Sequence, residues 1–420
     1  MSALDVWRDK QYVGRLDLST NGDVRFTYDP SVVETARPEH AIGLRCPVRA
    51  RPWVGGDPHA IFENLLPEGR LREALAAATK HTTTDTIGLL GVVGGECAGA
   101  LQLWPQGTSP PTADAYDELS PQMLDSAFAG AGGQWRQVTG RASLSGAQPK
   151  LVLWRMPPLG GEAPLYRLPR SGAPSTVIVK QPGDRFPGLL EAELVGMRLM
   201  AASGVPTASS VRCLVAADCH ESARFDRPVT TEGHVQRVHA EDGCQLTGRL
   251  SANKYAKQGA PTFQELVAAL NRASSSPLDD RELLFRWAVA NATIGNYDGH
   301  AKNVSVVYVG AERLRLAPAY DVVVTAQYEG LDQELALHFG GTTFPQALTP
   351  SSLRVAAREF GLGVSRTVEL ARDVVDRVQG SLPDVLHDVS QAGGTGLSLE
   401  RLSGVILRTS TELRDRLGLG

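Results

Sequence analysis

A short polar run, GNYDGHAKNVSVVY at residues 295–308, holds the side chains of this chain that are best suited to chemistry. Asp298, His300, Lys302 and Asn303 stand within six positions of one another. His300 is the first candidate, because an imidazole titrates near neutral pH and often serves as a general base or a metal ligand. The alternative is a solvated turn whose Asp and Asn side chains bond to their own backbone. The spacing of the acid and the amide bears on this choice.

Asp298 and Asn303 lie five positions apart, which is the spacing that phosphoryl transfer uses in protein kinases. There the Asp accepts the proton of the attacking hydroxyl and the Asn holds Mg²⁺. A second carboxylate should follow across a hairpin, and LAPAYDVV supplies Asp321 at that place. Mg²⁺ prefers hard oxygen ligands and needs few of them from the protein. The spacing therefore predicts Asp298 as base, with Asn303 and Asp321 as metal ligands.

A lysine ends the apolar run STVIVKQP at residues 175–182. Lys180 is costly to bury without a partner, so one interpretation is an edge-strand lysine that reaches solvent. The functional interpretation is a lysine that pairs with phosphates and is held by a glutamate of the next helix. Glu193 is the candidate partner. A lysine strand followed by a glutamate helix is typical of a kinase small lobe.

A Ser/Gly-rich loop precedes the strand KLVLW at residues 150–154. Its backbone N–H groups could form an anion nest, to which Lys150 would add charge, at Ser145, Gly146, Ala147 and Gln148. Pro149 removes one donor, and the loop matches no standard phosphate-binding motif. Taken alone, an ordinary turn before a strand is favoured here.

The elements around these residues predict an α+β chain. Residues 10–29 read as two strands around the turn Asn21-Gly22, and residues 59–80 as helical chain interrupted by Pro67. Strands are expected at 150–154, 175–182 and 211–216, with a helix at 188–204. From residue 262 the pattern turns helical, except for a hairpin that spans residues 303–324. This order is the layout of a protein-kinase-like bilobe, preceded by an N-terminal α+β subdomain.

Composition limits the classes of function. The net charge of −4 gives no broad basic face for nucleic acid. The five cysteines form no C-x-x-C pair, which indicates a reducing compartment. The first residues lack the apolar stretch of a signal peptide. The sequence contains no uninterrupted apolar run of about 18 residues, so we expect no membrane span. We therefore expect a cytoplasmic protein that binds no membrane and meets DNA only through a partner.

Taken together, these motifs resemble the HipA family of serine/threonine kinases, the toxins of bacterial type II toxin–antitoxin modules. The matching strings are SLSGAQPKLVL, VIVKQP, RFDRP, YDGHAKN and APAYDVV, behind an N-terminal region that contains NLLPEG and CAGAL. The resemblance covers nearly the whole chain. It implies an N-terminal subdomain at 1–104, a kinase small lobe at 123–228 and a helical large lobe at 229–420. Residues 105–122 are rich in Pro, Ser and Thr, which predicts a linker between the first two.

The resemblance also implies ATP and Mg²⁺ as cofactors and a role for each matching residue. Asp298 would be the catalytic base, and Asn303 and Asp321 would hold the metal. The ATP site would be formed by Ser145, Gly146, Ala147, Gln148, Pro149, Lys150, Lys180, Ala223, Arg224, Phe225, His300, Lys302, Asn303, Tyr320 and Asp321. Ala223–Phe225 would be the hinge, where Ala223 replaces a glutamate that is usual in the family. Ser143, with Ser145 as second choice, would be the site of an inhibitory autophosphorylation that ejects the phosphate loop.

The partners that the resemblance implies are a HipB-like helix-turn-helix antitoxin and a protein substrate, an aminoacyl-tRNA synthetase. Operator DNA would be reached only through the antitoxin. Two alternatives remain open at this stage. The chain could be a catalytically weak, nucleotide-binding co-repressor that acts with an antitoxin, or a kinase for a small molecule.

Overall fold

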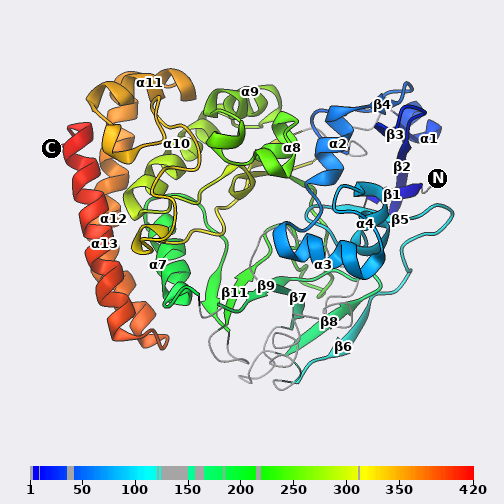
Figure 1. Cartoon of the computed structure of the whole chain (residues 1–420), viewed down its shortest axis with the longest axis horizontal. Helices are drawn as coiled ribbons and strands as arrows, with labels where there is room; N and C mark the ends of the chain where they lie inside the picture. The colour runs from blue at the N-terminus through cyan, green and yellow to red at the C-terminus, as the bar shows by residue number, and fades with distance from the viewer. Residues whose placement is uncertain are drawn as a thin grey trace. The chain divides into compact units, whose positions relative to one another are not determined.

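The structure of the chain is a computed structural model, shown in Figure 1. It describes residues 3–8, 10–35, 42–120, 123, 150–156, 165–182, 185–213, 219–310 and 313–420. The chain divides into two compact units. Unit 1 comprises Met1–Gln181, Cys213–Ser251 and Val307–Glu312, and unit 2 comprises Pro182–Arg212, Ala252–Val306 and Arg313–Gly420. The N-terminal region and the strands that follow it thus belong to one unit.

Unit 1 begins with a five-stranded antiparallel sheet in the order β4-β3-β2-β1-β5. The predicted hairpin at Asn21-Gly22 is confirmed, because Gly22 adopts φ 86° in the turn that joins β2 to β3. The strands are β1 (Leu4–Arg8), β2 (Gln11–Leu18), β3 (Val24–Tyr28), β4 (Trp53–Val54) and β5 (Leu101–Pro105). The helices are α1 (Pro30–Thr35), α2 (Gly56–Glu63), α3 (Gly69–Thr79) and α4 (Thr86–Val93), and Pro67 lies between α2 and α3 as expected. Their apolar faces share one core with the sheet, centred on Leu16, Phe26 and Phe62.

A second antiparallel sheet of unit 1 has the order β11-β9-β7-β8-β6. Its strands are β6 (Ala115–Glu118), β7 (Lys150–Arg155), β8 (Tyr166–Arg170), β9 (Val177–Lys180) and β11 (His220–Ala223). The sequence predicted β7 and β9 but not β8 or β11. The stretch predicted as a linker contains β6, an edge strand of mostly exposed residues that pairs with β8 on one side only. Beyond this sheet, unit 1 holds β12 (Ala240–Asp242), α8 (Gly243–Thr247) and the end of β13 (Ser305–Tyr308).

Unit 2 is mostly helical, with the long helix α12 packed against α7, α10, α11 and α13. In Figure 1, α12 and α13 run side by side at the C-terminal end of the chain. The helices are α7 (Leu189–Ala202), α9 (Phe263–Ala273), α10 (Pro277–Ile294), α11 (Pro350–Phe360), α12 (Val364–Gln391) and α13 (Gly396–Leu417), with strands β10 (Ser210–Arg212) and β14 (Leu314–Leu316). Short 3₁₀ turns lie at η2 (Ser251–Asn253), η3 (Ala256–Gln258), η4 (Ala301–Asn303), η5 (Thr325–Gln327) and η6 (Pro345–Ala347). The predicted helices at 188–204, 262–273 and 279–295 correspond to α7, α9 and α10.

Candidate functional site

The polar run at 295–308 begins where the buried helix α10 stops. Gly295 ends this helix in the left-handed conformation, at φ 79°, where a side chain would be strained and its Cβ would lie 2.8 Å from Ala326. The loop then folds tightly, since His300 N–H donates to the Asp298 carbonyl at 2.7 Å and Asn303 N–H donates to the His300 carbonyl at 2.9 Å. The loop is therefore held between a core helix and strand β13, and its geometry is fixed.

Asp298 is an exposed carboxylate on a rigidly supported backbone. Its N–H donates to the side-chain oxygen of Asn296 at 3.2 Å, and the Asn296 amide donates in turn to the Asn291 side chain at 2.8 Å. Asn291 lies on α10, so a chain of two amides connects the helix to the acid. Asn296 stands in the quoted run, and an Asn just after a helix that bonds forward to the backbone is a signal the sequence already carried.

A second support for Asp298 comes from a segment that no sequence motif identifies. The Tyr255 hydroxyl donates to Asp298 Oδ1 at 2.7 Å. The Tyr255 ring also packs edge-on against His300, with ring centroids 5.1 Å apart. Neither contact follows from spacing or periodicity, because residue 255 lies in an irregular stretch 43 positions before the acid.

Asn303 and Asp321 come together as predicted. The Asn303 side-chain nitrogen lies 3.3 Å from Asp321 Oδ2 and 3.4 Å from the Asp321 carbonyl oxygen. The other side-chain atom of Asn303, Oδ1, is buried and accepts no hydrogen bond from the part of the chain that the structure describes. A buried amide oxygen without a donor, beside a carboxylate, fits a hard cation such as Mg²⁺. No cluster of three or more His, Cys, Asp or Glu side chains suited to a metal occurs among the described residues.

The backbone at Asp321 is strained and firmly anchored. Asp321 adopts φ 58°, a left-handed conformation that residues with a side chain rarely adopt, although Asp tolerates it better than most. Two residues before it, Ala319 exchanges hydrogen bonds with residues 206 and 208, at 2.7 and 2.9 Å. After it, the segment lies against α7, where Gly196 has no side chain and a Cβ would collide with the Val322 carbonyl oxygen. Strain that is held on both sides in this way is typical of a functional position.

The three other large-lobe residues predicted for the ATP site lie on the same loop or beside it. His300 and Lys302 are buried, at 8% and 5% exposure. The Tyr320 hydroxyl donates to the Lys302 carbonyl at 2.6 Å and also bonds to Ser305 Oγ. Tyr320 therefore connects the loop at residues 295–303 to the segment that carries Asp321.

In unit 1 the second sheet brings three basic residues into one row. The register of β7, β9 and β11 places Lys150 and His220 directly opposite Lys180, one on each side. Side chains that lie opposite each other on neighbouring strands point to the same face of the sheet. Three basic groups in one row favour the binding of an anion such as a phosphate. His220 was not predicted, because no strand was expected between the stretch at 211–216 and the predicted hinge at Ala223–Phe225.

Two residues along from this row, the same face becomes largely apolar. Val152, Ile178 and Ser222 are opposite one another in the same register and, by the alternation of a strand, share the face of Lys180. The residues between the two rows, such as Leu151 and Val179, belong to the core on the opposite face. The sheet thus offers a basic row and, about 7 Å further along, a mostly apolar row. A nucleotide has this polarity, with phosphates at one end and a flat base at the other.

The predicted hinge, Ala223–Phe225, begins at the last residue of β11 and is fixed by a buried ionic cluster. Glu96 accepts hydrogen bonds from Arg224 at 2.9 Å and from Arg227 at 3.2 Å, and also pairs with Arg237. The other members bond as follows: Asp226 accepts from both Arg224 and Arg227 at 2.7–2.8 Å, Gly99 N–H donates to Asp226 at 2.7 Å, and Ser175 donates to Glu96 through N–H and Oγ at 2.9 Å. We call these residues the ionic cluster: Glu96, Arg224, Asp226, Arg227 and Arg237. The cluster joins the N-terminal region to the segment that follows β11.

The electrostatics of the ionic cluster follow from its composition. Burial alone would raise the pKa of Glu96, but the arginines and the Ser175 N–H outweigh it and hold that pKa well below its usual range. Burial likewise opposes the charge of Asp226, and Arg224 and Arg227 lower its pKa. The Arg224 guanidinium and N–H are both engaged within the protein, by the Cys97 carbonyl and the Thr176 carbonyl.

Several predicted residues are not brought together or lie outside the described residues. Lys180 is buried at the end of β9 in unit 1, and Glu193 is buried on α7 in unit 2, so their ion pair stays a prediction. The phosphate-loop residues Ser143 and 145–149 lie outside the described ranges. No helix within the described ranges has both the length and the apolar character needed to cross a membrane.

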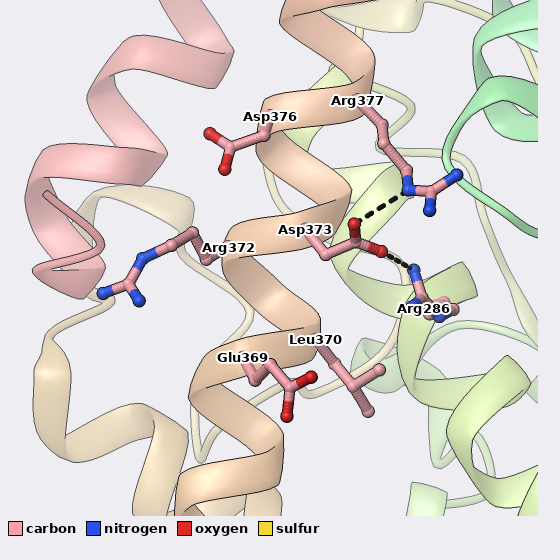
Figure 2. A pocket seen from close by; sticks show the side chains of 7 residues that line it. All are labelled: Arg286, Glu369, Leu370, Arg372, Asp373, Asp376 and Arg377. Atoms are coloured by element: carbon pink, nitrogen blue, oxygen red, sulfur yellow. Dashed lines mark hydrogen bonds and ion pairs between the residues drawn. The ribbon is translucent and has the colours of Figure 1, made fainter.

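A pocket of 410 Å³ lies elsewhere, on α10 and α12 in unit 2. Figure 2 shows that charged side chains line it, with Asp373 between Arg286 and Arg377, at 2.6 and 2.8 Å. None of the predicted site residues lines this pocket. Its charges already satisfy one another in part, so we do not assign the chemistry to it.

Comparison with known proteins bears on both parts of the chain. Residues 4–104 match the family model of the HipA N-terminal domain, and residues 142–382 match that of the HipA-like C-terminal domain. The chain is 32% identical over 409 residues to a putative kinase, Y4mE, of Sinorhizobium fredii, with 92% of each chain covered. It is 26% identical over 353 residues to the serine/threonine-protein kinase toxin HipA of Shewanella oneidensis, covering 78% of this chain and 76% of the relative.

The fold also has a solved counterpart. A structure of Shewanella oneidensis HipA, in a complex with HipB and its operator DNA, superposes with a TM-score of 0.82 at 20% identity. The match covers 99% of this chain and 97% of that one. It confirms the expected α+β fold class with a kinase-like bilobe.

Proposed function

Because the chain belongs to the HipA family, as its motifs predicted, we propose that it is a serine/threonine protein kinase that uses ATP and Mg²⁺ and acts as a toxin. The observation that carries the proposal is the convergence of Asp321 on Asn303, in the loop where Asp298 stands five positions earlier. An acid, an amide and a second acid in this relation are the parts that phosphoryl transfer requires. Kinase names among the relatives support the same conclusion.

In this proposal each unit supplies one part of the chemistry. In unit 1, the basic row of Lys150, Lys180 and His220 binds the phosphates of ATP. The row of Val152, Ile178 and Ser222 lies against the adenine ring of ATP. In unit 2, Asp298 accepts the proton of a substrate serine or threonine hydroxyl. The hydroxyl oxygen forms its bond to the γ-phosphorus as the bond from that phosphorus to the ADP oxygen breaks.

Asn303 and Asp321 would hold the metal in this reaction. When bound, Mg²⁺ supplies positive charge at the phosphate oxygens. The buried Oδ1 of Asn303 and the carboxylate of Asp321 are the oxygen ligands that the chain offers. His300 and Lys302 are buried on the same loop as Asn303. There they would support the loop backbone and place their charge near the two metal ligands.

Substrate, regulation and partners are proposed at the level of the family. We propose an aminoacyl-tRNA synthetase as the phosphorylated protein and a HipB-like helix-turn-helix antitoxin as the partner, through which the chain reaches operator DNA in the cytoplasm. The solved Shewanella HipA, which is in a complex with HipB and operator DNA, supports the antitoxin partner. Autophosphorylation at Ser143, or at Ser145 as second choice, would switch the enzyme off.

The test is phosphate transfer from labelled ATP with Mg²⁺, mapped by mass spectrometry, in the wild type and three variants. Asp298→Asn should lower the rate roughly 10²–10⁴-fold, because the base is lost while the shape is kept. Asp23→Asn is the matched control, since Asp23 is an exposed acid on the hairpin turn of the N-terminal sheet, and it should leave the rate unchanged. Ser143→Ala should remove the main labelled site.

Each outcome decides one part of the proposal. A wild type that labels neither itself nor any synthetase would refute the kinase function and favour the co-repressor. Full activity in Asp298→Asn would refute the assigned base. Label on Ser145 in place of Ser143 would refute the choice of serine, and transfer to a small molecule alone would favour a small-molecule kinase.

A further inference from the structure

We propose that Tyr255 is a positioning residue for the catalytic base, and that its hydroxyl both orients the Asp298 carboxylate and keeps it ionised. This inference rests on the proposed kinase function. Asp298 is exposed, and the terminal torsion of a carboxylate is broad, so a directed hydrogen bond narrows its orientation. The 2.7 Å hydrogen bond from Tyr255 to Oδ1 restricts that torsion. The direction in which Asp298 receives a proton is therefore set by a residue outside the catalytic loop, which comprises residues 295–303.

The phenol can do this because its own segment is fixed to the loop. Ala301 N–H, within the catalytic loop, donates to the Lys254 carbonyl at 3.1 Å. On the other side, Ala256 N–H donates to the Ala336 carbonyl at 2.7 Å. The Tyr255 ring lies at 84° to the His300 ring, in a T-shaped contact with the loop. Backbone hydrogen bonds on both sides of residue 255 and a ring contact hold the Tyr255 hydroxyl in place during phosphate transfer.

The hydrogen bond also has a direct chemical effect. A donor that bonds to a carboxylate stabilises the ionised form and lowers the pH at which it takes up a proton. A phenol, with an ordinary pKa near 10, keeps its own proton at neutral pH and stays a donor. In the transfer step the proton of the substrate hydroxyl passes to Asp298, and Tyr255 neither gains nor loses one. Removal of the phenol oxygen should therefore slow transfer and make the base protonate at a higher pH.

The experiment compares wild type, Tyr255→Phe and the matched control Tyr12→Phe, which removes one hydroxyl from a partly buried tyrosine of the N-terminal sheet. The measured quantities are the maximal initial rate of phosphate transfer from labelled ATP to the chain itself, the ATP concentration at half that rate, and the pH dependence from pH 5 to 9. Tyr255→Phe should lower the maximal rate roughly 10–100-fold, the range of a hydrogen bond to a charged group. The half-saturating ATP concentration should stay within about twofold, and the acid limb of the pH profile should move to higher pH.

Three results would overturn the inference. They are a Tyr255→Phe rate and pH profile equal to those of Tyr12→Phe, a change confined to the half-saturating ATP concentration, or a slower rate with an unmoved acid limb. If Tyr255→Phe does not fold, Tyr255→4-aminophenylalanine replaces it, because its amine occupies the place of the phenol oxygen and can still donate to Asp298. That variant should then exceed Tyr255→Leu in rate, and equal rates would overturn the inference. A wild type without any transfer would refute the proposed function itself, which is a separate outcome.

Discussion

Glu96→Gln should destabilise unit 1 far more than the loss of one surface charge. In the wild type, the buried ionic cluster sets three guanidiniums against two carboxylates, with Glu96 only 1% exposed. The substitution keeps the shape of the side chain and removes one negative charge. Three buried cations then face Asp226 alone, and the new amide directs a donor toward guanidiniums that need an acceptor.

The size of the effect follows from which partners remain. Arg224 and Arg227 keep Asp226, but among the described residues Glu96 is the only carboxylate bonded to Arg237. Removing one member of a buried pair costs about 3–5 kcal/mol, because the remaining charge is neither hydrated nor compensated. We expect a loss in that range for the free energy of unfolding at pH 7. Glu118→Gln is the control: Glu118 is 87% exposed and lies 3.4 Å from Arg167, so its loss should cost no more than about 1 kcal/mol.

The pH dependence gives a second measure of the same interaction. The pKa of Glu96 is held below its usual value near 4.5 in the folded chain. Its stabilisation is therefore fully present above about pH 4.5 and is lost as the pH falls toward the folded pKa. The difference between wild type and Glu96→Gln should be constant from pH 6 to 8 and should shrink in acid.

Urea unfolding followed by tryptophan fluorescence measures this difference, because all but one of the six tryptophans precede residue 155 and so report on unit 1. A loss below about 1 kcal/mol, no larger than that of Glu118→Gln, would refute the assigned role of the ionic cluster. A difference that grows in acid would refute the sign of the pKa shift.

Two further predictions concern backbone space and a second buried glutamate. Gly196→Ala on α7 should lower the free energy of unfolding by about 1–3 kcal/mol, because the new Cβ collides with the Val322 carbonyl oxygen. The control is Gly380→Ala on α12, where a Cβ meets nothing, and it should raise the free energy of unfolding by about 0.5–1 kcal/mol. Equal effects of the two substitutions in urea unfolding would contradict this prediction. Burial raises the pKa of Glu241 to about 7 despite its bonds from Tyr308 and Leu44, so the wild type should lose stability as the pH rises from about 4.5 to 7. Glu241→Gln should remove that slope, and a variant whose urea midpoints follow those of the wild type over this range would show that Glu241 does not titrate there.

The sequence predicted the parts of the site that depend on local spacing. Asp298 and Asn303 belong to one loop, and the turn after β14 returns Asp321 to it, so a hairpin between two recognisable strands was enough to place them together. Lys180 was identified for the same reason, since a lysine at the end of an apolar strand stands out from its neighbours.

Contacts between distant segments could not be predicted in this way. Tyr255 approaches Asp298 because the neighbouring Lys254 carbonyl accepts a hydrogen bond from Ala301 N–H of the loop, and an irregular segment carries no period from which such a contact follows. Glu96 and Arg224 stand 128 residues apart and look like ordinary charged residues until the fold buries both. The strand β6 was missed because an edge strand with mostly exposed residues lacks the apolar alternation that marks a strand.

The ionic cluster also has a consequence for the order in which the chain matures during synthesis. Glu96 is made 141 residues before Arg237, a delay on the order of 10 s at ordinary rates of translation. During that interval the core of the first sheet can already form, whereas the loop with Glu96 has no cation to receive it and stays hydrated. The N-terminal region therefore leaves the ribosome before the ionic cluster can form. The cluster forms only when the later segment with Arg224, Arg227 and Arg237 has been made.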